Sequence, residues 1–233
     1  MSEVVDSLAG FVTETREVVE RIATTTARTL AASSAPARAD LAPLEPLVVE
    51  ALGSTEAMLH GAGFVAAPHV LEDAPWWLEW FAWDAGTLQR LVTDNDPRGA
   101  HFFDYTLMPW FTGPRDSGER VITGPYVDYL CTDDYTLTFT SPVCLPDGAF
   151  AGVAGIDVRV AAVEQRFLGM LRASPQTLVL VNSLGRVVVS NSARMLSGDL
   201  VRDLDGASLS PVDDPRLTRI AGSELGLLDL GPR

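Results

Sequence analysis

The sequence predicts an α+β fold, in which a long N-terminal helix accompanies an antiparallel β-sheet flanked by further helices. Three observations carry this prediction. Residues 2–34 contain no proline and repeat apolar side chains at helical spacing. Residues 121–158 contain three strand-like runs separated by short turns, and a helical pattern follows at 160–171. Helices segregated from consecutive strands are typical of α+β domains.

The N-terminal helix is expected from Ser2 to about Ser34, because Ala35-Pro36 ends it. One stripe of its surface carries residues three or four apart: Val4, Leu8, Phe11, Thr15, Val18 and Ile22. This spacing is close to a coiled-coil seam. It predicts either a homodimer through this helix or a helix packed on its own domain, and with fewer than four clean heptads the two stay open.

A second helix is expected at 41–59, ended by Gly61 and Gly63, with a short strand at 64–67. The segment that begins at Gly61 matches GxGxxA, but it follows a helix instead of a strand, so we discard a dinucleotide site. The aromatic run Trp76–Trp83 favours a strand by β-propensity, although some of its tryptophans also fit helical spacing.

The remaining elements are expected from alternation, turn residues and helical spacing. In chain order they are a turn-rich segment at 113–118, strands at 121–131, 135–145 and 150–158, a helix at 160–171, a hairpin of 177–181 with 186–190, and an irregular polar C-terminus. The three strands in succession form an antiparallel meander.

Charge excludes several classes of function. All 17 basic residues are arginine, 31 residues are acidic, and the formal net charge is −14. A chain without lysine has no P-loop lysine and no Schiff base. The acidic surplus argues against nucleic-acid binding and against a polybasic membrane-surface helix. No signal peptide or spanning segment is recognised, and Cys131 and Cys144 are expected to be free and buried, so we expect a cytoplasmic protein without membrane insertion.

Several motifs follow one another between residues 103 and 160. They are Tyr105, Trp110-Phe111, Thr123-Gly124-Pro125-Tyr126-Val127-Asp128, Tyr135-Thr136-Leu137-Thr138, Ser141-Pro142-Val143, Asp147-Gly148 and Gly152-Val153-Ala154-Gly155-Ile156-Asp157-Val158. With the long N-terminal helix, this order resembles bacterial Cache sensor domains, and it is closest to the branch that binds amino acids or amines. The resemblance implies a PAS-like antiparallel sheet that cups a small ligand. It also implies sensing without catalysis and without a cofactor.

The resemblance further implies a set of ligand-binding residues. In the amino-acid-binding branch, an Arg and a Trp hold the ligand carboxylate, while a Tyr and two Asp hold its ammonium. Carried over by position, the candidates in this chain are Tyr105, Trp110, Phe111, Tyr126, Asp128 and Asp157. The Arg expected two residues before the Trp is Met108 here. This departure predicts a cationic amine or polyamine in place of a zwitterionic amino acid.

Elementary chemistry agrees with the ammonium half of this site. Tyr126 and Asp128 are two residues apart on one predicted strand, so they face the same side. Two carboxylates on neighbouring strands, Asp128 and Asp157, destabilise each other unless a cation lies between them. An ammonium group has three donors, which suit two carboxylates and a phenol oxygen. The alternatives are that Asp128 caps a turn and that Asp157 caps the helix after it.

We therefore expect three regions: the N-terminal helix (1–40), a Cache-like ligand-binding domain (41–172) and a C-terminal hairpin extension (173–233), which resembles the start of a second Cache subdomain. The expected function is a non-catalytic sensor of a small cationic amine or amino-acid-like ligand, in signalling or in regulation of transport or metabolism. One alternative is a dimerising adaptor with a self-filled pocket. The other is an enzyme acting on amines through the pair of aspartates. No metal site is expected, because the three histidines are too few and too scattered.

Overall fold

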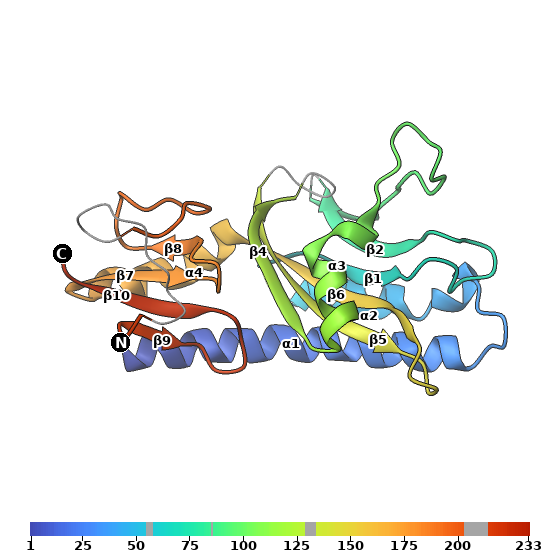
Figure 1. Cartoon of the computed structure of the whole chain (residues 1–233), viewed down its shortest axis with the longest axis horizontal. Helices are drawn as coiled ribbons and strands as arrows, with labels where there is room; N and C mark the ends of the chain where they lie inside the picture. Colours follow the sequence, from blue (N-terminus) through green and yellow to red (C-terminus); the bar gives the residue numbers. More distant parts are fainter. Residues whose placement is uncertain (55–57, 85, 129–133, 203–213) are drawn as a thin grey trace. The chain divides into compact units, whose positions relative to one another are not determined.

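The computed structural model describes residues 1–54, 58–84, 86–128, 134–202 and 214–233 (Figure 1). Its helices are α1 (Ser2–Ala31), α2 (Leu44–Ser54), α3 (Pro109–Ser117) and α4 (Val160–Ala173), with 3-10 turns η1 (Arg38–Leu41) and η2 (Tyr105–Leu107). Its strands are β1 (Leu59–Ala66), β2 (Leu78–Asp84), β3 (Thr87–Arg90), β4 (Val121–Val127), β5 (Tyr135–Cys144), β6 (Phe150–Arg159), β7 (Gln176–Val181), β8 (Val187–Ser190), β9 (Leu217–Arg219) and β10 (Gly226–Pro232).

The described strands form two sheets, and the predicted α+β class is confirmed. The larger antiparallel sheet has the order β3-β2-β1-β6-β5-β4, and the smaller sheet has the order β8-β7-β10-β9. The predicted meander is present as β4, β5 and β6, which are neighbours in the larger sheet. The turn predicted at 132–134 falls mostly outside the described residues.

The chain divides into two compact units, each built from segments that are distant in sequence. The first unit contains residues 1–14, 122–137 and 158–233, and the second contains residues 15–121 and 138–157. The contiguous boundaries expected near residues 40 and 172 are not among these divisions. Helix α1 contributes its first half to one unit and its second half to the other.

Helix α1 buries the apolar stripe that its sequence indicates. Leu8 and Phe11 are 2% and 3% exposed, and Ile22 is fully buried. In the first unit, the ring of Phe11 packs edge-on against Phe167 of α4, with the ring centroids 5.7 Å apart. These side chains are therefore covered by the chain itself. This is the packing of a helix on its own domain, and it leaves no open seam at these residues.

The C-terminal extension is a four-stranded sheet, where an irregular segment with one hairpin was expected. Strand β10 pairs with both β7 and β9 in antiparallel register. A core of six buried residues lies within this unit: Val179, Val181, Val187, Val201, Leu228 and Leu230. The Asn191 side chain joins this sheet to the end of α4, because its amide donates to Leu171 O and Gln176 O at 2.6 and 2.9 Å.

Strand β1 begins at Leu59, five residues before the expected strand, so Gly61 and Gly63 lie inside a strand and do not end a helix. The close approach of β2 explains both glycines. A Cβ atom on Gly63 would overlap the backbone of Glu79 and Trp80, and one on Gly61 would lie 2.7 Å from Trp80 Nε1. The strand preference of the aromatic run is confirmed by β2.

The segment expected to be turn-rich at 113–118 is mostly the last part of α3. Pro109 occupies the first turn of this helix, where a missing backbone N–H costs nothing. Gly118, with φ of 70°, ends the helix in the left-handed conformation. Helix capping at these two residues therefore outweighs the turn propensity of the residues between them.

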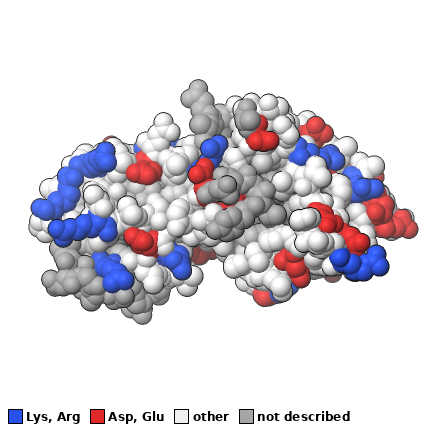
Figure 2. Space-filling model, turned by 90° about the horizontal axis from the view of Figure 1, so that it is seen from above, with Lys and Arg blue, Asp and Glu red and all other residues white. Residues whose placement is uncertain are grey.

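The surface charge, the hydropathy of the helices and the exposure of Cys144 relate to the predictions made from composition. Figure 2 shows both acidic (red) and basic (blue) side chains among uncharged residues on the face that it draws. None of the described helices has the length and hydropathy needed to cross a membrane. Cys144 is a free, exposed thiol at the end of β5, so the expected burial is wrong for this residue; Cys131 lies outside the described residues.

Candidate functional site

The larger sheet presents two different faces within the second unit. On one face, Ser141 of β5 donates a 2.9 Å hydrogen bond to Glu20 of α1, and α2 contacts β1 and β2. Figure 1 draws α2 behind this sheet and α3 in front of it. Glu79 belongs to the helix-covered face, because the negative charge of Glu45 in α2 is close enough to help raise the pKa of Glu79. Because strand side chains alternate, Trp80 lies on the opposite face.

The face that carries Trp80 is rich in glycine. Trp80 pairs with Gly63, and Ala82 pairs with Gly61 in the β1–β2 register. A Cβ atom on Gly155 of β6 would lie 3.3 Å from the Trp80 ring and 3.1 Å from the methyl group of Thr140. We call this surface the glycine face; it consists of Gly61, Gly63, Trp80, Thr138, Thr140, Gly155 and Asp157.

Asp157 lies on this face near the Trp80 ring. Gly155, where a Cβ atom would lie 3.3 Å from that ring, is two residues before Asp157 on β6, so Asp157 faces the same side of the strand. Thr140 and Thr138 of β5 mark the same face, because a Cβ atom on Gly155 would meet Thr140 and Thr138 bonds Asp157. The Trp80 indole and the Asp157 carboxylate therefore share one face of the sheet.

The Asp157 carboxylate is buried and held in place. The residue is 4% exposed, and Thr138 Oγ1 donates to its Oδ1 atom at 2.6 Å. The helix-cap alternative does not apply, because Arg159 occupies the N-cap position of α4. A buried carboxylate that is held in a fixed position can form a strong, charge-assisted hydrogen bond with a cationic group. Asp157 is for this reason a candidate in this unit for binding a positively charged group.

The aromatic candidates form a packed cluster in the same unit. The centroid of the Tyr105 ring lies 5.1 Å from that of Trp76 and 5.5 Å from that of Phe111. The Trp110 ring lies edge-on to Phe111, with the centroids 6.3 Å apart. The Tyr105 hydroxyl donates to Ala66 O at 2.8 Å and accepts from Trp77 N–H at 3.3 Å. Burial raises the pKa of Tyr105 to about 12. The Tyr105 hydroxyl is thus committed to backbone groups at the edge of the sheet.

Tyr126 and Asp128 belong to the first unit. Tyr126 is half-buried in β4, and Asp128 follows that strand with 7% exposure. The Asp128 N–H donates a long hydrogen bond of 3.4 Å to Asp134 O. Since Asp157, Trp110, Phe111 and Tyr105 belong to the second unit, the predicted grouping of all six residues stays a prediction from sequence. Met108, where an Arg was expected, is the half-buried N-cap of α3.

Trp80 and Thr138 are functional candidates that sequence patterns alone do not identify. In the sequence, Trp80 is one member of an aromatic run and Thr138 is part of a longer motif. Strand alternation gives one available signal. Thr136, Thr138 and Thr140 alternate with Leu137 and Phe139, which marks a polar face on β5.

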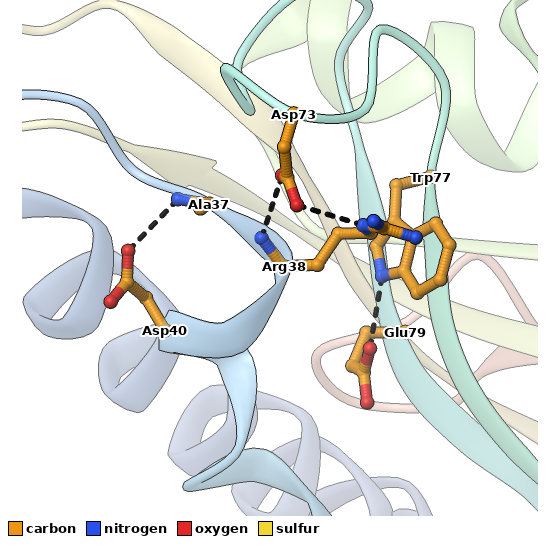
Figure 3. A network of polar contacts seen from close by, with 6 residues as sticks. All are labelled: Ala37, Arg38, Asp40, Asp73, Trp77 and Glu79. Carbon is orange, nitrogen blue, oxygen red and sulfur yellow. Dashed lines mark hydrogen bonds and ion pairs between the residues drawn. The ribbon is translucent and has the colours of Figure 1, made fainter.

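A polar network on the helix-covered face fixes the chain that leads into β2 (Figure 3). Arg38 binds Asp73 through its backbone N–H and its Nε, both at 2.9 Å, and its guanidinium lies 5.0 Å from the Trp77 ring centroid. The Trp77 indole donates to Glu79 at 2.9 Å, and Arg90 lies 2.6 Å from the same carboxylate.

Two carboxylates of this network have shifted pKa values. Burial raises the pKa of Glu79 above its ordinary value, although the Trp77 hydrogen bond and Arg90 oppose that change. The hydrogen bonds from Arg38 lower the pKa of Asp73. The network is internally paired, so it has a structural role.

Comparisons with known proteins identify the fold. No family model matches the chain, and no curated protein does either. Among solved structures, the extracellular domain of the candidate histidine kinase mmHK1S-Z2 matches with a TM-score of 0.68 and 12% identity, over 98% of this chain and 92% of that chain.

Two ligand-bound chemoreceptor domains also match. The ligand-binding domain of the Pseudomonas aeruginosa PAO1 amino-acid chemoreceptor PctC, in complex with GABA, has a TM-score of 0.60 at 15% identity, over 98% of this chain and 94% of that chain. The ligand-binding domain of Pseudomonas fluorescens chemoreceptor CtaA, in complex with L-valine, has a TM-score of 0.60 at 18% identity, over 97% and 90%. The chain spans 64% of the extracellular domain of mmHK1S-Z3, another candidate histidine kinase. The chain has the Cache-type fold that its motifs predict.

The cytoplasmic location expected from the sequence is wrong. Matched structures that share this fold are extracellular domains of candidate histidine kinases. The expectation relies on the lack of a spanning or signal segment within 233 residues and on two unpaired cysteines. Neither observation distinguishes a cytoplasmic protein from the folded body of an extracellular sensor domain, because such a body needs no spanning helix and no disulfide.

Proposed function

We propose that this chain is the ligand-binding domain of a sensor and that it binds a small molecule with a cationic amine. The buried Asp157 carboxylate on the glycine face is the observation that carries this proposal. Its Thr138 hydrogen bond fixes one oxygen in position. A protonated amine beside this buried carboxylate would form a charge-assisted hydrogen bond with it. The GABA- and valine-bound structures of the same fold support a ligand that contains an ammonium group.

Sensing is favoured over catalysis by the surroundings of the candidate residues. The Tyr105 hydroxyl is held by the sheet backbone, and Phe111 has no group that transfers a proton. The matched domains belong to chemoreceptors and candidate histidine kinases. We therefore assign the chain to signal recognition, with Trp110 as an aromatic wall for the cation. The part of Tyr126 and Asp128 in ammonium binding stays a prediction from the sequence.

A thermal-shift panel of amines, polyamines, amino acids and simple carboxylates tests this proposal. A ligand at about 100 times its dissociation constant adds about 2.7 kcal/mol to the free energy of unfolding. We expect amine-containing compounds to raise the melting temperature of the wild type. Stabilisation by carboxylates alone would refute the ammonium assignment.

Matched variants locate the site. Asp157→Asn is expected to remove most of the shift, whereas Asp147→Asn changes an exposed turn residue and is expected to leave the shift unchanged. Asp128→Asn tests the sequence-based prediction separately, and an unchanged shift would remove Asp128 from the site. The enzyme alternative predicts product after long incubation with a stabilising amine, which mass spectrometry of the recovered ligand would detect.

A further inference from the structure

The Trp80 indole N–H is a buried donor that the described protein leaves unsatisfied. Trp80 is 6% exposed, and its Nε1 atom has no hydrogen-bond partner among the described residues. Buried indole N–H groups normally find an acceptor, because losing water without a replacement is unfavourable. The position is also fixed, since the ring lies over Gly61 and reaches Gly155. A ligand on the glycine face could therefore provide the acceptor for this N–H group.

The location of this donor connects it to the proposed amine site. The Trp80 ring extends from Gly61 to Gly155, and Asp157 lies two residues beyond Gly155 on the same face of β6. One small molecule on this face can therefore contact the Asp157 carboxylate with an ammonium group and reach the indole N–H. Such a molecule satisfies Trp80 only if it carries an acceptor atom a few bonds from its nitrogen.

The charge of this face indicates what kind of acceptor fits. In the second unit, none of the strand residues that alternate onto the glycine face is an Arg or a His. The next position on β6, Arg159, belongs to the first unit, where its guanidinium lies 3.9 Å from Asp134. A ligand carboxylate at Trp80 would lie beside the Asp157 carboxylate, and these strand residues of the second unit offer it no cation. A hydroxyl or carbonyl oxygen carries no such penalty.

Resting on the proposed function, we infer that Trp80 is a specificity-determining residue and that the ligand is an amino alcohol or a similar cation with a neutral acceptor oxygen. The ammonium group binds Asp157, and the neutral oxygen accepts from Trp80 Nε1–H. Simple alkylamines and fully protonated polyamines lack the acceptor, so they leave the indole N–H unpaired. Amino carboxylates supply an acceptor but also a second negative charge near Asp157.

A matched ligand series tests this inference on the full chain. Titration calorimetry would compare amines with two, three and four carbons, each ending in a hydroxyl, a methyl or a carboxylate group. The hydroxyl compounds are 2-aminoethanol, 3-aminopropan-1-ol and 4-aminobutan-1-ol; the matching amines are ethylamine, propylamine and butylamine; the matching acids are glycine, β-alanine and GABA. At the chain length that binds best, we expect the hydroxyl compound to bind about tenfold more tightly than the alkylamine.

The variant Trp80→Phe keeps an aromatic ring and removes only the indole N–H together with part of the ring. It is expected to equalise the affinities of the hydroxyl compound and the alkylamine. Its melting temperature without ligand is expected to fall, because the smaller ring leaves space beside Gly61 and Gly155 even though no hydrogen bond is lost. Should this variant fail to fold, the wild-type affinity ratio still decides the question.

The outcomes separate this inference from the proposed function. Equal affinities for the hydroxyl compound and the alkylamine in the wild type overturn the role of Trp80, as does a preference that persists in Trp80→Phe. Tightest binding by the amino carboxylate overturns the neutral-acceptor class. In each of these cases amines still bind, so the proposed function stands. Failure of every amine and amino acid to bind refutes the proposed function itself.

Discussion

Replacing Gly63 with Ala tests the packing that shapes the glycine face. Gly63 lies in the middle of β1, and a Cβ atom there would overlap the Glu79 carbonyl and the Trp80 backbone. The obstructing atoms belong to the hydrogen-bonded β2 backbone, which cannot rotate away as a flexible side chain does. Adding a methyl group to such a site costs about 1–3 kcal/mol. The lower entropy of the unfolded alanine chain recovers less than about 1 kcal/mol of that cost.

The same substitution at other glycines is the control. Gly10 in α1 and Gly53 in α2 have open space where a Cβ atom would be placed. In helices, Gly→Ala stabilises by up to about 1 kcal/mol, so these two variants are expected to gain stability. Urea unfolding followed by circular dichroism gives the free energy of each variant. A Gly63→Ala protein as stable as the wild type would refute the close approach of β1 and β2.

Three further substitutions test other parts of the structure. Burial raises the pKa of Glu79, so its contribution to stability is fully present below about pH 4.5, its ordinary pKa, and is lost as the pH rises through the folded-state value. Glu79→Gln removes this pH dependence. The melting temperature of the variant minus that of the wild type should increase from pH 4.5 to pH 7. A difference that stays constant would contradict the raised pKa of Glu79. Tyr105→Phe leaves the Ala66 carbonyl and a backbone N–H without their buried partner, and we expect a loss of about 1–3 kcal/mol in urea unfolding. A loss below about 0.5 kcal/mol would show that this hydroxyl does not hold the sheet. Asn191→Ala removes the side-chain bonds between α4 and β7 in the first unit and is expected to cost about 2–3 kcal/mol. Stability equal to the wild type would refute that role.

The parts of the fold with strong local signals are predictable from the sequence. The N-terminal helix is predictable from its apolar stripe. The strands of the meander are predictable because their side chains alternate between apolar and polar, and turn residues such as Gly148 separate one strand from the next. The start of β1 is not predictable in this way. Gly61 and Gly63 resemble helix terminators locally, and only the approach of Trp80 from β2 explains why a strand needs glycine there.

The C-terminal sheet is missed for a related reason. Strand β9 has only three residues, and β10 pairs with β7 from far along the chain, so neither has a local signal comparable to that of the hairpin. Asp157 is identifiable by resemblance to a motif. Trp80 is not, because its importance depends on an unpaired N–H that only the three-dimensional structure reveals. The cellular location depends on what surrounds a domain, and composition carries little information about that.

The central claim is that Asp157 binds the amine of the ligand, and titration calorimetry of one pair of variants tests it most directly. The wild type, Asp157→Asn and the control Asp147→Asn would be titrated with the amine that stabilises the wild type most. Losing a charge-assisted hydrogen bond is expected to weaken binding by roughly 10- to 100-fold in Asp157→Asn. The control is expected to bind as the wild type does. An Asp157→Asn protein that folds normally and binds within twofold of the wild type would contradict the claim.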